Sequence, residues 1–179
     1  MIPGKRLGVA VLTNQESSEA FNAITLRAID TYLGAPALDY LGFFSARRDT
    51  ARAQLAATSQ VVTAARDSMS GPSLPLAKFA GGYVDAWYGD VSVAMEGSGL
   101  VMRFSHTPQL VGDLVHWQHD SFLVKWRDRE LRADAYATFA LNPDGSIDQL
   151  KMAPASDEVD FSFDFQDLLL RPAPPARTP

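Results

Sequence analysis

The sequence predicts a mainly β protein in which a strand and two helices precede an eight-stranded antiparallel barrel. After residue 73, apolar and polar residues alternate in short runs, which indicates strands with one buried and one solvated face. Turn sequences such as Gly97-Ser98-Gly99 and Asn142-Pro143-Asp144-Gly145 separate these runs. Before residue 73, two longer stretches carry apolar residues at helical spacing, which predicts an α segment ahead of the sheet.

The first predicted element is a strand over Leu7–Thr13. Its residues are nearly all apolar and include the β-branched Val9 and Val11, a composition typical of a strand covered on both faces. An amphipathic helix is predicted over Phe21–Leu33, followed by stop signals. A second helical stretch is predicted from Leu38 to Ser68.

Glycine and proline near residues 70–75 mark the clearest boundary in the chain. We therefore predict four segments. Residues 1–36 hold the first strand and helix, 37–73 form a helical linker, 74–167 form the barrel, and 168–179 form a disordered tail. The tail prediction follows from four prolines in the last eight residues.

Eight strands are enough to close an up-and-down barrel, whose interior is filled by side chains or holds one small ligand. The last predicted strand alternates Val159, Phe161, Phe163 and Phe165 with polar residues. The predicted strands are Tyr83–Tyr88, Val91–Glu96, Leu100–Phe104, Leu110–Gln118, Ser121–Arg127, Ala135–Leu141, Ile147–Met152 and Val159–Phe165.

Charge and composition exclude several classes of function. The net charge is −5, and the acidic excess lies in the β region, which disfavours nucleic acid and anionic membranes as partners. The chain has no cysteine, so it has no disulfide or thiolate metal site. No apolar run is long enough for a membrane span, and no signal peptide is visible. The compartment stays undecided.

The sequence also lacks the common nucleophile motifs. It contains no Ser-x-x-Lys, Tyr-x-Asn, Lys-Thr-Gly or Gly-x-Ser-x-Gly pattern. We therefore predict that the chain is not an enzyme on its own and needs no cofactor.

One cluster of polar residues could carry chemistry. Asp113, His116, His119 and Asp120 offer two imidazoles and two carboxylates, as a metal or proton-transfer site would. On a strand, however, His116 and His119 lie three residues apart and face opposite sides. We therefore predict no metal site, and expect these residues to pack or to shape a hairpin.

Three tryptophans, Trp87, Trp117 and Trp126, could either fill the core or line a ligand pocket. If the barrel holds a ligand, the candidate lining residues are Trp87, His116, Trp117, His119 and Trp126.

The segments Lys5–Asn14 and Phe21–Leu33 resemble the last core strand and the C-terminal helix of β-lactamase-related, penicillin-binding-protein-like serine hydrolases. The stretches Leu76–Tyr83, His116–Phe122 and Phe139–Gly145 resemble the lipocalin-like domain of unknown function appended to many of these enzymes. The resemblance covers nearly the whole chain. None of the family's catalytic residues has a counterpart here, because the segments that carry them would precede Met1.

The resemblance implies a non-catalytic accessory module that docks on a serine-hydrolase catalytic domain, in cis or in trans, and shapes substrate access. Enzymes of this family are often periplasmic or secreted. A stand-alone lipocalin-like carrier of a small apolar ligand is the alternative, and an enzyme using His116, His119 and Asp120 is a third. Because Leu7–Thr13 would expose an apolar strand edge, we also predict a homodimer through residues 1–33.

Overall fold

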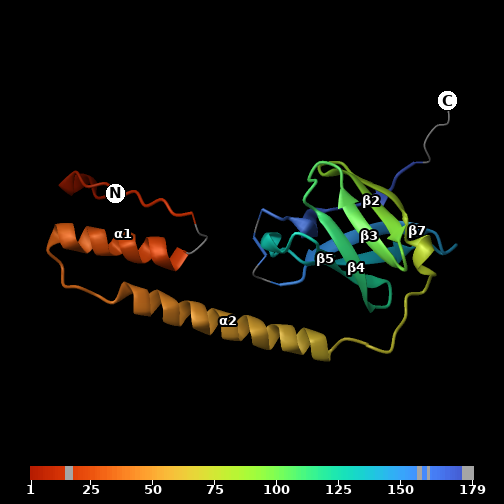
Figure 1. Ribbon diagram of the computed structural model, residues 1–179, viewed down its shortest axis with the longest axis horizontal. Coiled ribbons are helices and arrows are strands. Elements are labelled where there is room, and N and C mark those ends of the chain that lie inside the picture. Colours follow the sequence, from red (N-terminus) through yellow and green to blue (C-terminus); the bar gives the residue numbers. More distant parts are fainter. Residues whose placement is uncertain (15–17, 157–158, 161, 175–179) are drawn as a thin grey trace. The chain divides into compact units, whose positions relative to one another are not determined.

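The computed structural model describes residues 1–14, 18–156, 159–160 and 162–174 (Figure 1). The chain divides into two compact units, Met1–Gln60 and Val61–Pro179, which are described separately below. No helix in the described part of the chain combines the length and apolarity needed to span a bilayer.

The first unit is helical. A 3-10 turn over Pro3–Lys5 is followed by α1 (Ser18–Leu33) and by most of α2 (Tyr40–Ala64), so the prediction of two helices is confirmed. Gly34, with φ of +68°, ends α1, and the Ala35 amide donates to the Asp30 carbonyl at 2.9 Å, as in a Schellman C-cap. The Asp39 carboxylate accepts the Gly42 amide at 2.9 Å and caps α2. No described residue of this unit is fully buried.

The strand predicted over Leu7–Thr13 is wrong. Leu7 forms a single bridge with Ile2, in which the Ile2 amide donates to the Leu7 carbonyl at 2.8 Å. Beyond it, residues 8–12 make no backbone hydrogen bond to any described residue. A run that is apolar on both faces becomes a strand only when neighbouring strands pair with it, and beyond the Ile2–Leu7 bridge no described residue does so.

The second unit is an eight-stranded antiparallel sheet that curls into a nearly closed barrel, which confirms the predicted fold class. Each strand pairs with its neighbours in sequence order, except that β8 joins the free edge of β1. The strands are β1 (Gly81–Asp85), β2 (Gly89–Glu96), β3 (Gly99–Phe104), β4 (Val111–Gln118), β5 (Ser121–Trp126), β6 (Ala135–Leu141), β7 (Ile147–Pro154) and β8 (Arg171–Pro172).

The eighth strand lies elsewhere than predicted. None of the described residues between Val159 and Phe165 is in a strand, and Phe161 lies outside the described residues. The Asp160 carboxylate accepts the Ser162 amide at 2.8 Å, which turns the chain, and a 3-10 helix over Phe165–Asp167 follows. The alternation therefore belongs to a turn and to a short segment that enters the core, in which Phe165 is fully buried and Phe163 is half-buried.

The disordered tail predicted for residues 168–179 is also wrong over its first five residues. Leu168 and Leu170 are buried, and β8 follows at once. The Leu150 amide donates to the Leu170 carbonyl at 2.8 Å, while the Ala173 amide donates to the Gly82 carbonyl at 2.8 Å. This short segment thus connects β7 with β1 and closes most of the remaining gap in the barrel.

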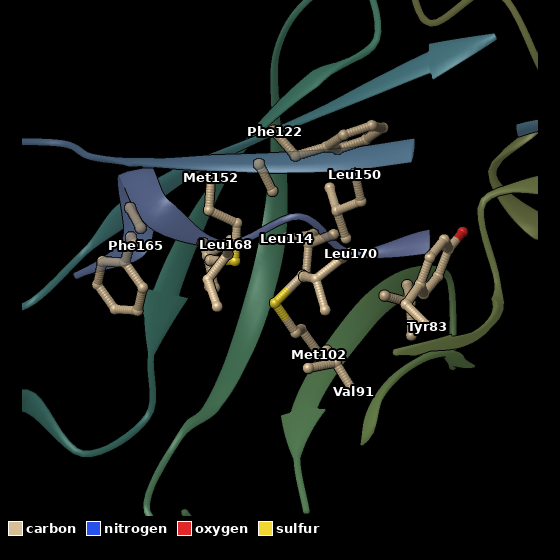
Figure 2. Close-up of a cluster of buried hydrophobic side chains, with 14 of the residues drawn as sticks. Tyr83, Val91, Met102, Leu114, Phe122, Leu150, Met152, Phe165, Leu168 and Leu170 are labelled. Carbon is tan, nitrogen blue, oxygen red and sulfur yellow. The ribbon is translucent and has the colours of Figure 1, made fainter. Parts of the chain in front are cut away.

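Side chains fill the barrel interior. Figure 2 shows residues of β1, β3 and β7 meeting Leu168 and Leu170 from the C-terminal segment. Phe79 lies 5.2 Å from Phe122 and 4.9 Å from Phe139 between ring centroids. On β2, Val91 and Val93 point inward as their alternation indicates, but Met95 near the strand end is 39% exposed.

Candidate functional site

The candidate residues named from the sequence lie in different surroundings. Trp87, on the turn after β1, is 89% exposed. Trp126 is fully buried, donates its indole N–H to the Ala133 carbonyl at 2.6 Å, and stacks on Phe165 at 5.9 Å between centroids. His116, Trp117 and His119 come together at the hairpin between β4 and β5, where they form contacts within the second unit.

There, the hairpin binds the segment that follows α2. Arg66 places its guanidinium carbon 4.6 Å from the centroid of the Trp117 ring, a cation–π contact. The same guanidinium donates hydrogen bonds to the carbonyl of Trp117 and, at 3.4 Å, to the carbonyl of His116. Tyr136 covers Trp117, with 5.2 Å between ring centroids. The Arg66 guanidinium is therefore held both by the cation–π contact with Trp117 and by hydrogen bonds to two carbonyls.

Asp67, Ser70 and Ser73, which lie between α2 and β1, also form hydrogen bonds with this hairpin. The Asp67 amide donates to the Gln118 side-chain oxygen at 2.8 Å, and the His119 amide donates to Ser70 Oγ at 2.9 Å. We call the contacts of Arg66, Asp67, Ser70 and Ser73 with residues 116–120 the linker contact. Its last member is a pair of hydrogen bonds, both 2.7 Å long, from the amide and hydroxyl of Ser73 to the Asp120 carboxylate.

The two histidines have structural partners within this contact. A bulge between His116 and Gln118 and a left-handed backbone at His119, with φ of +46°, bring His116 Nε2 to 2.9 Å from the His119 carbonyl. His119 Nε2 also lies 3.8 Å from an Asp67 carboxylate oxygen. Among the described residues, no group of three or more histidine, aspartate and glutamate side chains is arranged to hold a metal.

Asp113 lies in a different group of charges. Its carboxylate accepts from Arg127 at 2.8 Å, and Arg127 also binds Glu96 at 3.1 Å on the outer face of the sheet. The hydrogen bonds from Arg127 lower the pKa of Asp113, while those from Arg127 and Arg103 lower the pKa of Glu96. These side chains are partly exposed, so the network contributes little to stability.

Asp85 was not singled out from the sequence, yet it is a buried charged residue at the end of β1. Burial alone would raise the pKa of its carboxyl. Three backbone amides donate to it, from Tyr88 at 2.9 Å, from Leu169 at 2.8 Å and from Trp87 at 2.8 Å, and together they hold the pKa below its ordinary value. Asp85 thereby joins the β1–β2 turn to the C-terminal segment. In the sequence, the local signal for this arrangement is an Asx-type turn, in which the Asp85 carboxylate accepts the amides of Trp87 and Tyr88, two and three residues later.

Two comparisons with known proteins gave matches. The model of a family described as a domain of unknown function (DUF3471) matches residues 65–172. Among solved structures, the "Crystal structure of C-terminal domain of penicillin binding protein Rv0907" is similar, with 24% sequence identity and a TM-score of 0.44. That match covers 60% of this chain and 94% of the other. No curated protein matches the chain.

Proposed function

Because the chain belongs to the DUF3471 family, we propose that it is the non-catalytic accessory domain of a β-lactamase-related serine hydrolase, and that residues 1–60 dock on the catalytic domain. The observation that carries this proposal is the absence of any fully buried residue among the described residues of the first unit. In this proposal, the first unit attaches the folded barrel to the catalytic domain.

The two helices present apolar side chains that stay largely exposed to solvent. Ile24 on α1 is 52% exposed, and Leu41 and Phe43 on α2 are 62% and 56% exposed. Most of the stability of a helix in a protein comes from packing of its apolar face, and exposed apolar surface of this kind is typical of an interface. The helices therefore support a docking role for the first unit.

The extended residues before α1 add a second reason. Residues 8–12 leave their backbone donors and acceptors without partners among the described residues, and Val9 and Val11 are only half-buried. Such a segment binds well at the edge of another sheet, where main-chain hydrogen bonds supply affinity. This agrees with the resemblance of Lys5–Asn14 and Phe21–Leu33 to a core strand and C-terminal helix.

The filled barrel favours this role over that of a ligand carrier. A lipocalin-like carrier needs an apolar interior of hundreds of Å³, on the order of 300–1,000 Å³ for a small molecule. The rings of Phe79, Phe122 and Phe139 pack against one another in that space, and Trp126 stacks on Phe165. Shaping of substrate access would then come from the outer surface of the barrel.

Binding to the catalytic domain tests the proposal. The segment to use is one encoded next to this chain in its genome that carries both Ser-x-x-Lys and Tyr-x-Asn. Isothermal titration should show binding to residues 1–179, no binding to residues 65–179, and weakened binding for Ile24→Lys. The variant Val115→Lys, at a partly exposed position on β4, is the matched control. Equal binding by residues 65–179 would overturn the docking role of the first unit.

In isolation we expect the same surface to pair with a second copy. Light scattering should give a dimer for residues 1–179 and a monomer for 65–179. A fluorescent penicillin should label neither form, because the chain lacks the nucleophile motifs. A monomeric full chain at high micromolar concentration would contradict self-association, and stoichiometric labelling of a serine would contradict the non-catalytic role.

A further inference from the structure

A hollow of about 710 Å³ opens on the second unit, and neither the linker contact nor the docking surface uses it. It lies where β1 and β7 begin, and its walls include Lys78, Gly81, Gly82, Asp144 and Ile147. Its volume falls within the range of small-molecule sites, roughly 300–1,000 Å³.

The hollow exists because the barrel closes unevenly. At one level, the Leu150 amide of β7 donates to Leu170. One residue further along the C-terminal segment, the contact with β7 is made by a side chain instead, because the Arg171 guanidinium donates to the carbonyl and carboxylate of Asp148. β8 itself pairs with β1, and just after β8 the Ala173 amide donates to the Gly82 carbonyl, so the segment continues along β1. The start of β7 is therefore separated from the start of β1.

Two consecutive glycines at the start of β1 form part of the wall, and the fold does not require either of them. Neither has a positive φ. A Cβ at Gly81 would meet only a Tyr83 ring carbon at 3.9 Å, and one at Gly82 would meet only the Ala173 Cβ at 3.4 Å. Glycine in a strand costs stability, and one of its uses is the close approach of a ligand or another backbone. The bare backbone at residues 81–82 therefore points to an occupant of the hollow.

The charges on the wall indicate what kind of occupant fits. Lys78 and Asp144 are the only charged side chains among the described residues that line the hollow, and neither forms an ion pair with another described residue. The amide and hydroxyl of Ser146 donate to Asp144 at 2.9 and 2.6 Å, which fixes this carboxylate in place. The wall therefore offers one cation and one anion together with a bare stretch of backbone, which matches a ligand with one charge of each sign.

We propose that the hollow binds a short extended peptide with free termini, which lies against Gly81 and Gly82 with its carboxylate at Lys78 and its ammonium group at Asp144. Apolar wall residues, Leu74 and Ile147 among them, contact its side chains. This site is separate from the docking role of the first unit and holds whether or not that role is correct.

Amide chemical shifts of the full chain, titrated with tri-alanine, test the proposal. We expect saturable shifts at Gly81, Gly82 and Ser146, in the millimolar range. N-acetyl tri-alanine and tri-alanine amide should each bind more weakly by about three- to fivefold, as the loss of one partly exposed ion pair implies. Saturable shifts that are equal for the free and the capped peptides would overturn the assignment of the two charges.

Variants locate the site. Gly81→Ala places a methyl group on the wall without a clash in the free protein, so the fold should persist while binding weakens. Lys78→Met should weaken tri-alanine and leave tri-alanine amide unaffected, because the amide lacks the carboxylate. Lys125→Met removes a different exposed lysine and serves as the matched control. Shifts that are absent, or that respond equally to Lys78→Met and Lys125→Met, would overturn the proposal.

Discussion

The two units of this chain are both rich in apolar side chains but differ in how many of them they bury. Every buried hydrophobic residue in the described chain lies at Phe79 or beyond, whereas in residues 1–60 the large apolar side chains stay partly or largely exposed. The difference follows from connectivity. In the second unit, strands that follow one another in the sequence pair with each other, so each strand is covered by the next without a partner protein. A lone extended segment with two helices has no such neighbours and needs a partner to bury its apolar face.

Separating the units should give the largest effect. Residues 65–179 should unfold cooperatively on heating, since the whole core lies within them. Residues 1–60 should show no cooperative transition at low micromolar concentration, because helices without a packed face are marginal. Circular dichroism of the two fragments measures both. A cooperative melt of residues 1–60 would mean that this unit has a core of its own.

Removing one aromatic ring from each unit sharpens the comparison. Phe79→Ala should lower the free energy of unfolding by about 3–5 kcal/mol, because this ring is fully buried against Phe122 and Phe139. Phe43→Ala in α2 should cost less than about 1 kcal/mol, because that ring is 56% exposed. Urea unfolding of the full chain gives both values, and similar costs would contradict the contrast in burial.

A buried carboxylate gives the next effect. Asp85→Asn should cost roughly 1.5–3 kcal/mol at neutral pH, since three amide donors lose a charged acceptor. The folded pKa of Asp85 is lowered, so its stabilising contribution is present above the ordinary aspartate pKa and is lost as the pH falls through the lowered value.

Unfolding measured from neutral to acid pH should therefore show a smaller loss of stability for Asp85→Asn than for the wild type. Asp164→Asn is the control, because that side chain is exposed and makes no capping hydrogen bond. It should change the free energy of unfolding by less than about 0.5 kcal/mol. An unchanged acid profile in Asp85→Asn would show that Asp85 is not the group that titrates.

The linker contact should give the smallest effect. Arg66→Ala should cost about 1–2 kcal/mol, from the loss of its cation–π contact with Trp117 and its hydrogen bonds to two carbonyls. Arg52→Ala, at an exposed position on α2, should cost less than about 0.5 kcal/mol. Equal costs would show that the linker contact does not stabilise the second unit. Denaturant unfolding of both variants distinguishes these outcomes.

Most of the barrel could be predicted because its signals are local. Alternation, turn sequences such as Asn142–Gly145, and hairpin connectivity placed seven strands within a few residues of their observed bounds. Both helices were likewise marked by apolar residues at helical spacing, and the end of α1 was marked by Gly34. These features depend on residues close together in the chain, so their pattern is visible without tertiary structure.

The remaining features depended on partners that are distant in the sequence. Val159–Phe165 has the alternation of a strand, yet Asp160 turns the chain and Phe165 enters the core. The linker contact joins Arg66 to Trp117, about fifty residues away, so the histidines beside it resembled a candidate site. Tertiary structure decided these cases because a free backbone edge, a stacking ring or a buried carboxylate is satisfied by whichever group lies near it in space, and spacing along the chain does not identify that group.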